Sequence, residues 1–151
     1  MHTISVLLVG MVLVMGIGCV RSQHPGTPMS STCLEVPTVE ECRATAGAIT
    51  DERLWDCVWQ QCECVSVNCS EAIREECRLK KMREGKAVMG FTFQPQFTTP
   101  FHPVREVNWC EEPVSRECRA KAMVHELAHA CGWKHQMGGG VPGDDGELRC
   151  D

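Results

Sequence analysis

Residues 125–135 constrain the fold of this chain more than any other stretch, because their order specifies a helix that ends in a turn. They read His-Glu-Leu-Ala-His-Ala-Cys-Gly-Trp-Lys-His. His125 and His129 are four residues apart, so on a helix their side chains lie on one face, one turn apart. Gly132 can adopt the left-handed conformation that ends a helix and turns the chain. The turn would bring His135 back toward the other two histidines.

Three imidazoles gathered in this way predict a metal site. Three protein ligands with one open position are typical of a catalytic zinc rather than of a structural one. Glu126 follows the first histidine, where its carboxylate could act as general base toward a water at the open position. The alternative is that the histidines are ordinary surface residues of an amphipathic helix. The pattern fixes five positions, three of them histidine, and such a match seldom arises by chance.

The same eleven residues resemble the zinc signature of the metzincin metallopeptidases, and more broadly of the zincins. The resemblance covers only this signature. It implies a zinc metalloendopeptidase of zincin-like α+β fold, with Zn²⁺ on His125, His129 and His135 and a zinc-activated water for which Glu126 is the general base. The family also has a methionine turn beneath the zinc, usually farther beyond the third histidine. Here Met137 follows by two residues and no later methionine exists. Either Met137 serves in a shortened turn, or the chain is a divergent or minimal member.

Three acidic residues near the C-terminal end are further candidates around the metal. Asp144, Asp145 or Glu147 could orient a ligand histidine. If His135 is not the third ligand, one of these carboxylates is the next candidate, as in related zincins.

Peptide hydrolysis also needs a donor for the developing oxyanion. Some zincins use a tyrosine, and this chain contains none. Zinc alone, a backbone N–H, His102 or Arg105 would then have to serve. Phe91 and Phe93 fall on one parity, so residues 88–93 predict a strand with one apolar face, and Pro95 indicates either that the strand lies at a sheet edge or that it ends there. By resemblance, residues 88–94 would bind the substrate backbone; the alternative is a strand of the core.

The N-terminal residues predict export. Residues 4–17 are apolar and uncharged, and we interpret 1–18 as a signal peptide because the run is short for a membrane span. Cys19 follows a small-x-small cleavage pattern that is also similar to a bacterial lipobox, so it is either lipidated or part of a disulfide. Residues 19–32 are polar and predict a flexible tether. The protein would be secreted, periplasmic or lipid-anchored at the cell surface.

Twelve cysteines in 151 residues predict a disulfide-rich domain, since an exported chain meets an oxidising environment. Seven of them lie between Cys33 and Cys77. We therefore divide the rest of the chain into a cysteine-rich helical and hairpin segment, 33–85, and a zinc-binding catalytic segment, 86–151. Cys150 would attach the C-terminal tail, to Cys131 or Cys110. The alternative for the first segment is a zinc cluster, and its candidate ligands are Cys57, Cys62, Cys64 and Cys69.

Local signals place the remaining elements. Thr38 and Glu41 form a capping-box pattern for a short helix that Gly47 would end, and residues 54–67 suit a strand pair by alternation. Ser70 would cap a helix over 71–84, which Gly85 would close. We expect the helix of the histidines to begin near Glu111, Glu112 and Pro113. Its buried side would consist of Ala120, Val124, Leu127, Ala128 and Cys131.

The charge balance bears on partners. A net charge of −5 gives no electrostatic footprint for nucleic acid, so we expect a peptide or protein substrate and a monomer, with membrane attachment only through a lipid on Cys19. The rival hypothesis is a disulfide-rich secreted or surface module without catalysis, in which the histidines hold a structural or vestigial metal.

Overall fold

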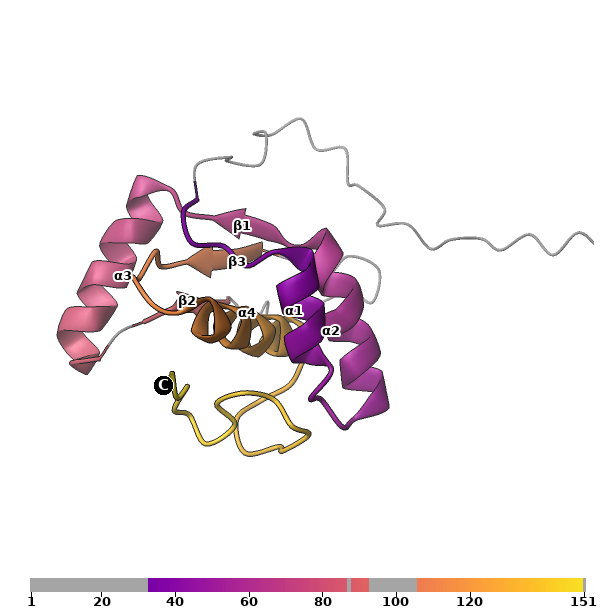
Figure 1. Cartoon of the computed structure of the whole chain (residues 1–151). Helices are drawn as coiled ribbons and strands as arrows, with labels where there is room; N and C mark the ends of the chain where they lie inside the picture. Colours follow the sequence, from indigo (N-terminus) through magenta and orange to yellow (C-terminus); the bar gives the residue numbers. More distant parts are fainter. Residues whose placement is uncertain (1–32, 87, 93–105, 151) are drawn as a thin grey trace, which may run out of the picture.

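The computed structural model describes residues 33–86, 88–92 and 106–150 (Figure 1). Within these ranges the chain is an α+β structure with four helices and one three-stranded sheet, which confirms the expected fold class. No helix in this part of the chain has the length and apolar character needed to cross a membrane. The elements are α1 (Val39–Ala46), α2 (Glu52–Cys64), β1 (Ser66–Asn68), α3 (Glu71–Glu84), β2 (Gly90–Phe91), β3 (Glu106–Trp109) and α4 (Arg116–Ala130).

Some expectations from the sequence fall outside the described residues. They concern the signal peptide 1–18, the tether 19–32 with the lipid on Cys19, and the oxyanion candidates His102 and Arg105.

The sheet has the order β1-β3-β2. β1 pairs in parallel with β3, with Val67 opposite Val107, and β2 pairs antiparallel to β3, with Gly90 opposite Trp109. β2 is therefore an edge strand, as Pro95 led us to expect, although the strand itself covers only Gly90–Phe91.

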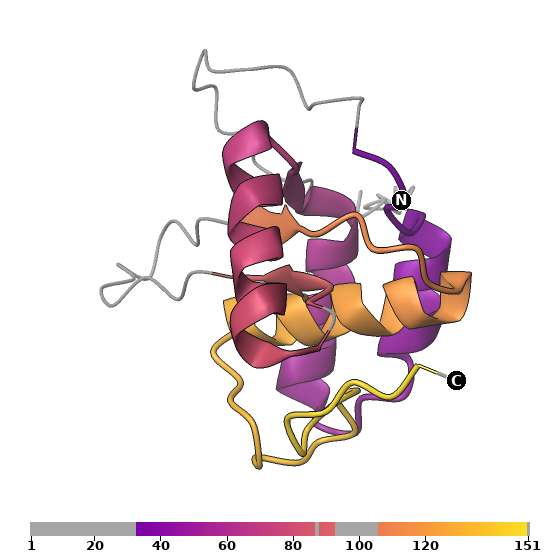
Figure 2. The same ribbon diagram turned by 90° about the vertical axis from the view of Figure 1, so that its left-hand side faces the viewer.

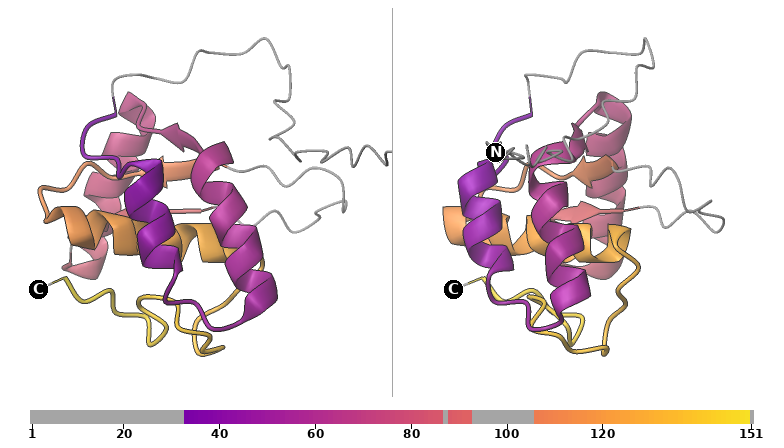
Figure 3. Two further views of the ribbon diagram at one scale, coloured as in Figure 1. Left: turned by 45° about the vertical axis from the view of Figure 1, so that its right-hand side comes forward. Right: turned by 90° about the vertical axis from the view of Figure 1, so that its right-hand side faces the viewer.

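Helix α4 lies at the centre of the molecule. It packs against α1 and α2 as well as against β2 and β3, and Figure 3 shows α1 and α2 side by side across it. Eight of its 15 residues are buried, among them the predicted Ala120, Val124, Leu127 and Ala128, whereas Cys131 is only partly buried. Each large apolar side chain removed from water in this way stabilises the fold by about 1.5–3 kcal/mol. The segment that carries the histidines is thus also the main core element.

The predicted strand pair over 54–67 is wrong, because residues 52–64 form α2 and only residues 66–68 are a strand. The Asp51 carboxylate accepts from the Leu54 N–H and so caps the helix. The residues that α2 buries are Val58, Gln61 and Cys62, a helical spacing rather than an alternating one. The short alternation near Cys62 and Val65 was misleading because a few residues do not distinguish the two periods.

The other helix boundaries follow their local signals closely. Thr38 and Glu41 form the capping box of α1, and Gly47 ends it. α3 runs from Glu71 to Glu84, as predicted; its last turn is closed by Gly85 at φ +68°, while the Ser70 side chain makes no capping bond. α4 begins later than expected, at Arg116. Its cap is Ser115, whose side chain accepts from the Cys118 N–H.

Five disulfides crosslink the described residues. They are Cys33–Cys69, Cys42–Cys62, Cys57–Cys131, Cys77–Cys110 and Cys118–Cys150. The tail is attached as expected, but Cys150 pairs with Cys118, so the two predicted partners are wrong. A zinc cluster in the first segment is excluded because Cys57, Cys62 and Cys69 each form a disulfide with a cysteine outside the proposed cluster. Such a density of disulfides is typical of an oxidising, extracellular environment.

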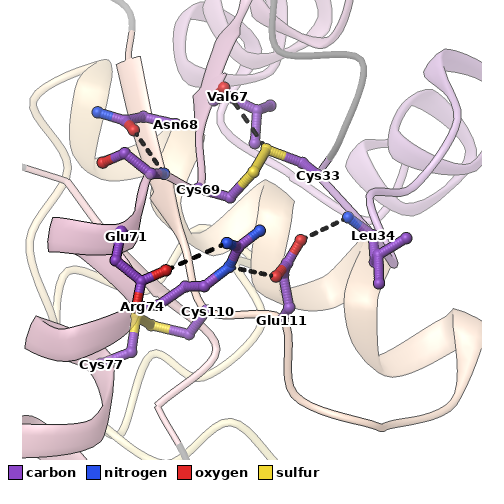
Figure 4. A network of polar contacts seen from close by, with 11 residues as sticks. Cys33, Leu34, Val67, Asn68, Cys69, Glu71, Arg74, Cys77, Cys110 and Glu111 are labelled. Carbon is purple, nitrogen blue, oxygen red and sulfur yellow. Dashed lines mark hydrogen bonds and ion pairs between the residues drawn. A yellow bond between two sulfur atoms is a disulfide. The ribbon is translucent and has the colours of Figure 1, made fainter.

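Helix α3 stands apart from the core, at the front of the view in Figure 2. Of its 14 residues only Cys77 is buried, through its disulfide with Cys110. Two acidic residues of the β3–α4 connection also hold the helix. Arg74 donates to Glu111 at 2.9 Å, and Lys81 lies 2.9 Å from a Glu112 oxygen. Figure 4 shows that Glu111 also accepts from the Leu34 N–H, between two disulfides.

Candidate metal centre

The three histidines of the motif meet at one point. Their Nε2 atoms are 3.1 Å apart between His125 and His129, 3.2 Å between His129 and His135, and 3.1 Å between His135 and His125. The third ring reaches this point through the turn that follows α4, in which Gly132 has φ +89°. The Trp133 N–H bonds the Ala128 carbonyl, and the Gly132 N–H bonds the His129 carbonyl. This is the Schellman arrangement, and it confirms the turn expected from the glycine.

The Nδ1 atoms of two rings are fixed by backbone carbonyls. Nδ1 of His125 lies 2.6 Å from the Pro142 oxygen, and Nδ1 of His129 lies 3.0 Å from the Trp133 oxygen. A carbonyl oxygen can only accept, so each Nδ1 must carry the proton and donate it. In the neutral imidazole the lone pair is then on Nε2, the atom that points to the centre of the cluster.

Converging lone pairs repel one another unless a cation lies among them. Two of the three Nε2 atoms have no proton to share when their rings are neutral, so a network of hydrogen bonds within the cluster cannot satisfy all three. Tetrahedral zinc with nitrogen ligands at its usual bond length requires nitrogens about 3.3 Å apart. The observed 3.1–3.2 Å is close to that value, so the residues present fit a zinc ion.

Burial favours the form of the ring that binds metal. Desolvation lowers the pKa of His125 from its usual range; the Pro142 carbonyl opposes this shift, and the neighbouring His129 and His135 add to it. The imidazolium form is disfavoured, and neutral imidazole is the ligand. His135 is the most exposed of the three rings, so the cluster opens toward solvent on its side.

Glu126 lies next to the cluster in a buried position, with 9% of its surface exposed. Its Oε2 accepts from the Thr92 hydroxyl at 2.9 Å. Thr92 directly follows β2, which passes close to α4: a Cβ on Gly90 would lie 3.4 Å from the Glu126 side chain. Burial raises the pKa of Glu126, against the lowering effects of Thr92, His129 and Lys80. A raised pKa makes the carboxylate a stronger proton acceptor than an ordinary glutamate.

Two of the three acidic residues suggested for the surroundings of the metal, Asp144 and Asp145, bond to other groups, although the Asp144 charge also acts on His125. Both oxygens of Asp144 accept from the Gly138 N–H, and Asp145 pairs with Arg149. The groups that orient His125 and His129 are carbonyls, so the predicted carboxylates are wrong for these two rings. No carboxylate is needed as third ligand, since His135 is in place.

Met137 does not occupy a buried position under the histidines. It is 63% exposed, and its sulfur lies 3.2 Å from the Lys134 backbone nitrogen. A shortened methionine turn beneath the metal is thus not what the structure shows. The alternative, a divergent or minimal member of the family, stays a prediction.

Sequence reasoning missed three residues of this site: Thr92, Trp133 and Pro142. Pro142 and Trp133 orient the rings through backbone carbonyls, which any residue type provides, so their identity gives no signal for this particular role. Thr92 directly follows β2, 34 positions before Glu126, and nothing local connects the two residues.

The arrangement can hold one divalent cation on three neutral nitrogens, with a buried carboxylate beside it. The candidate ligand atoms of His125, His129 and His135 all lie within 4.8 Å of one another. No protein-family model, curated protein or solved structure matches this chain. The chemistry of the site must therefore be argued from its own residues.

Proposed function

We propose that this protein is an exported zinc-dependent peptidase. The observation that carries the proposal is the combination of three converging Nε2 atoms with a buried carboxylate one residue from the first of them. The resemblance of residues 125–135 to the metzincin signature supports the same function. The ligand set leaves room for a further ligand, as catalytic zinc sites do.

Each side chain has a defined part in this proposal. His125, His129 and His135 bind zinc through Nε2, and the carbonyls of Pro142 and Trp133 keep the first two rings in the required tautomer. When bound, zinc supplies a Lewis acid that makes water more acidic and polarises a peptide carbonyl. Glu126 takes the proton of the attacking water on a carboxylate oxygen and passes it to the leaving amine nitrogen.

Thr92 holds the carboxylate that does this. Its hydroxyl donates to Oε2 of Glu126 at 2.9 Å, and a second hydrogen bond to the carboxylate comes from the Thr92 backbone.

The extracellular location rests on the disulfides and on the expected signal peptide. Five bridges in so short a domain persist only where thiols are not kept reduced. The mass of the mature N-terminus would distinguish a released protein from a lipid-anchored one.

The test is hydrolysis of casein or gelatin by the purified, oxidised protein. We expect a chelator to abolish hydrolysis and one equivalent of zinc to restore it. Glu126→Gln should retain one zinc per chain and lose activity by about 10²–10⁴-fold, as expected for a general base. The matched control is Glu112→Gln. It removes the same negative charge, but at the ion pair with Lys81 of α3. Undiminished hydrolysis by E126Q would refute the proposal.

The second candidate is a non-catalytic module with a structural or vestigial metal. The deep burial of Glu126 favours it, because a carboxylate 9% exposed and bonded to Thr92 is less accessible to a substrate. This candidate predicts that zinc binds and stabilises the protein while no peptide substrate is cleaved.

A further inference from the structure

We infer that Trp133 is the positioning residue for the whole metal centre: its indole packs against all three imidazoles, and its backbone and ring nitrogen fix the segments that carry them. The inference rests on the proposed metal site, and it does not require the site to be catalytic.

The ring contacts are the first line of support. The centroid of the Trp133 ring lies 5.5 Å from that of His125, 5.1 Å from His129 and 5.7 Å from His135. The contacts are tilted or edge-on, at interplanar angles of 79°, 45° and 64°. These are the distances and orientations at which aromatic rings attract one another. One side chain therefore restricts the rotation of every ligand ring.

Burial shows on which side of the cluster the indole lies. Trp133 is 3% exposed, whereas His135 is an exposed residue. The indole thus closes the cluster toward the protein interior, and the open side of the ligand set faces solvent. An apolar wall beside a metal also lowers the local dielectric, which strengthens the interaction between the cation and its ligands.

Polar contacts of the same residue hold three separate segments. The Trp133 N–H bonds Ala128 at the end of α4, and the Trp133 carbonyl accepts from Nδ1 of His129. Indole Nε1 donates to the Gly138 carbonyl at 3.0 Å, in the loop that follows the third histidine. The helix end, a ligand ring and the next loop are tied to one residue.

The test compares two buried tryptophans. Trp109 is 1% exposed and belongs to β3, outside the segment that carries the ligands, so Trp109→Phe is the matched control for Trp133→Phe and Trp133→Leu. The readouts are the Zn²⁺ affinity by chelator competition, the visible spectrum of the Co²⁺-loaded protein, and the unfolding midpoint of the metal-free protein. The Co²⁺ spectrum reports ligand geometry, which a loss of stability alone does not change.

We expect W133L to weaken Zn²⁺ binding about 10–100-fold and to alter the Co²⁺ spectrum, as loss of groups around a metal commonly does. W133F should lie between W133L and the wild type, because it keeps an aromatic ring but loses the bond to Gly138. W109F should lower the unfolding midpoint and leave the Zn²⁺ affinity and the spectrum unchanged.

Two results would overturn the inference: wild-type Zn²⁺ affinity and spectrum in W133L, or equal weakening of Zn²⁺ binding by W109F. If W133L does not fold, W133F is compared with W109F. Weaker Zn²⁺ binding in W133F alone supports the inference, and equal Zn²⁺ binding in the two variants overturns it. A wild-type protein that binds one zinc but cleaves no peptide refutes the peptidase function and leaves the role of Trp133 intact.

Discussion

Helices α3 and α4 are nearly equal in length, and they are held in opposite ways. α4 buries eight of its 15 residues and touches two helices and two strands, whereas α3 buries one of 14. The position of α3 depends on one disulfide and on ion pairs with Glu111 and Glu112. α4 is held mainly by packing, to which the Cys118–Cys150 disulfide and ion pairs of Arg116 and Arg119 are added, whereas α3 depends on its disulfide and charges almost alone.

The two helices indicate where this small domain needs precision. Three ligand rings must meet within a few tenths of an ångström, and dense packing around α4 restricts each of them. α3 supplies none of the three histidines, although the charge of its Lys80 acts on the Glu126 carboxyl. Movement of α3 should therefore leave the geometry of the three rings unchanged. Variants in each region test whether the two are separate in this way.

The core of α4 should give the strongest response. Leu127 is fully buried, and Leu127→Ala should lower the free energy of unfolding by about 2–5 kcal/mol. The matched control is Leu79→Ala in α3, a residue 45% exposed, which should change it by less than about 0.5 kcal/mol. Urea unfolding of the metal-free proteins measures both. Equal losses would show that α3 belongs to the cooperative core.

The second comparison removes one disulfide at a time. One double variant is Cys57→Ala/Cys131→Ala, and the other is Cys77→Ala/Cys110→Ala. Each lacks one bridge and should lose about 2–4 kcal/mol of unfolding free energy. Only the first pair joins the turn that carries the ligands, so only that variant should bind Zn²⁺ more weakly. The second should instead lose amide protection along α3 in hydrogen exchange. Weakened Zn²⁺ binding in the variant without Cys77 would contradict the separation of the two regions.

The weakest response concerns the charge that holds α3. Burial raises the pKa of Glu111, but the bonds from the Leu34 N–H and from Arg74 outweigh it and hold that pKa below its usual range. The ionised form stabilises the fold, so its contribution is complete above the unfolded pKa of about 4.3 and is lost as pH falls through the lower folded value.

Glu111→Gln should therefore cost about 1 kcal/mol at pH 7, and the gap to the wild type should close in acid. Unfolding in urea at a series of pH values from about 7 to about 3, on either side of the ordinary glutamate pKa, measures the gap. A gap that is constant across that range would mean that the Glu111 charge does not contribute.

The contrast between local and distant contacts also explains what the sequence could predict. The spacing of His125 and His129 and the position of Gly132 are local features, and they were enough to place all three ligands. Thr38 and Gly85 marked helix ends for the same reason. The short alternation near Cys62 favours a strand where the structure has α2. The residues that α2 buries have a helical spacing, which is the better guide here.

Contacts between distant segments could not be predicted. The partner of Cys150 is 32 positions away, and many pairings of the cysteines are compatible with their spacing. The bond between Thr92 and Glu126 depends on how closely β2 approaches α4, which Gly90 permits but does not reveal.

The bridge between Cys57 and Cys131 has a consequence for the order of maturation. In a reduced chain, Cys131 would present a soft sulfur ligand within the same eleven residues as the three histidines, and thiolates bind zinc readily. Zinc that arrived before oxidation could be captured by sulfur and would then oppose closure of the crosslink. Oxidation before loading would remove that competitor, so we expect the proposed metal site to fill correctly only after the crosslink has closed.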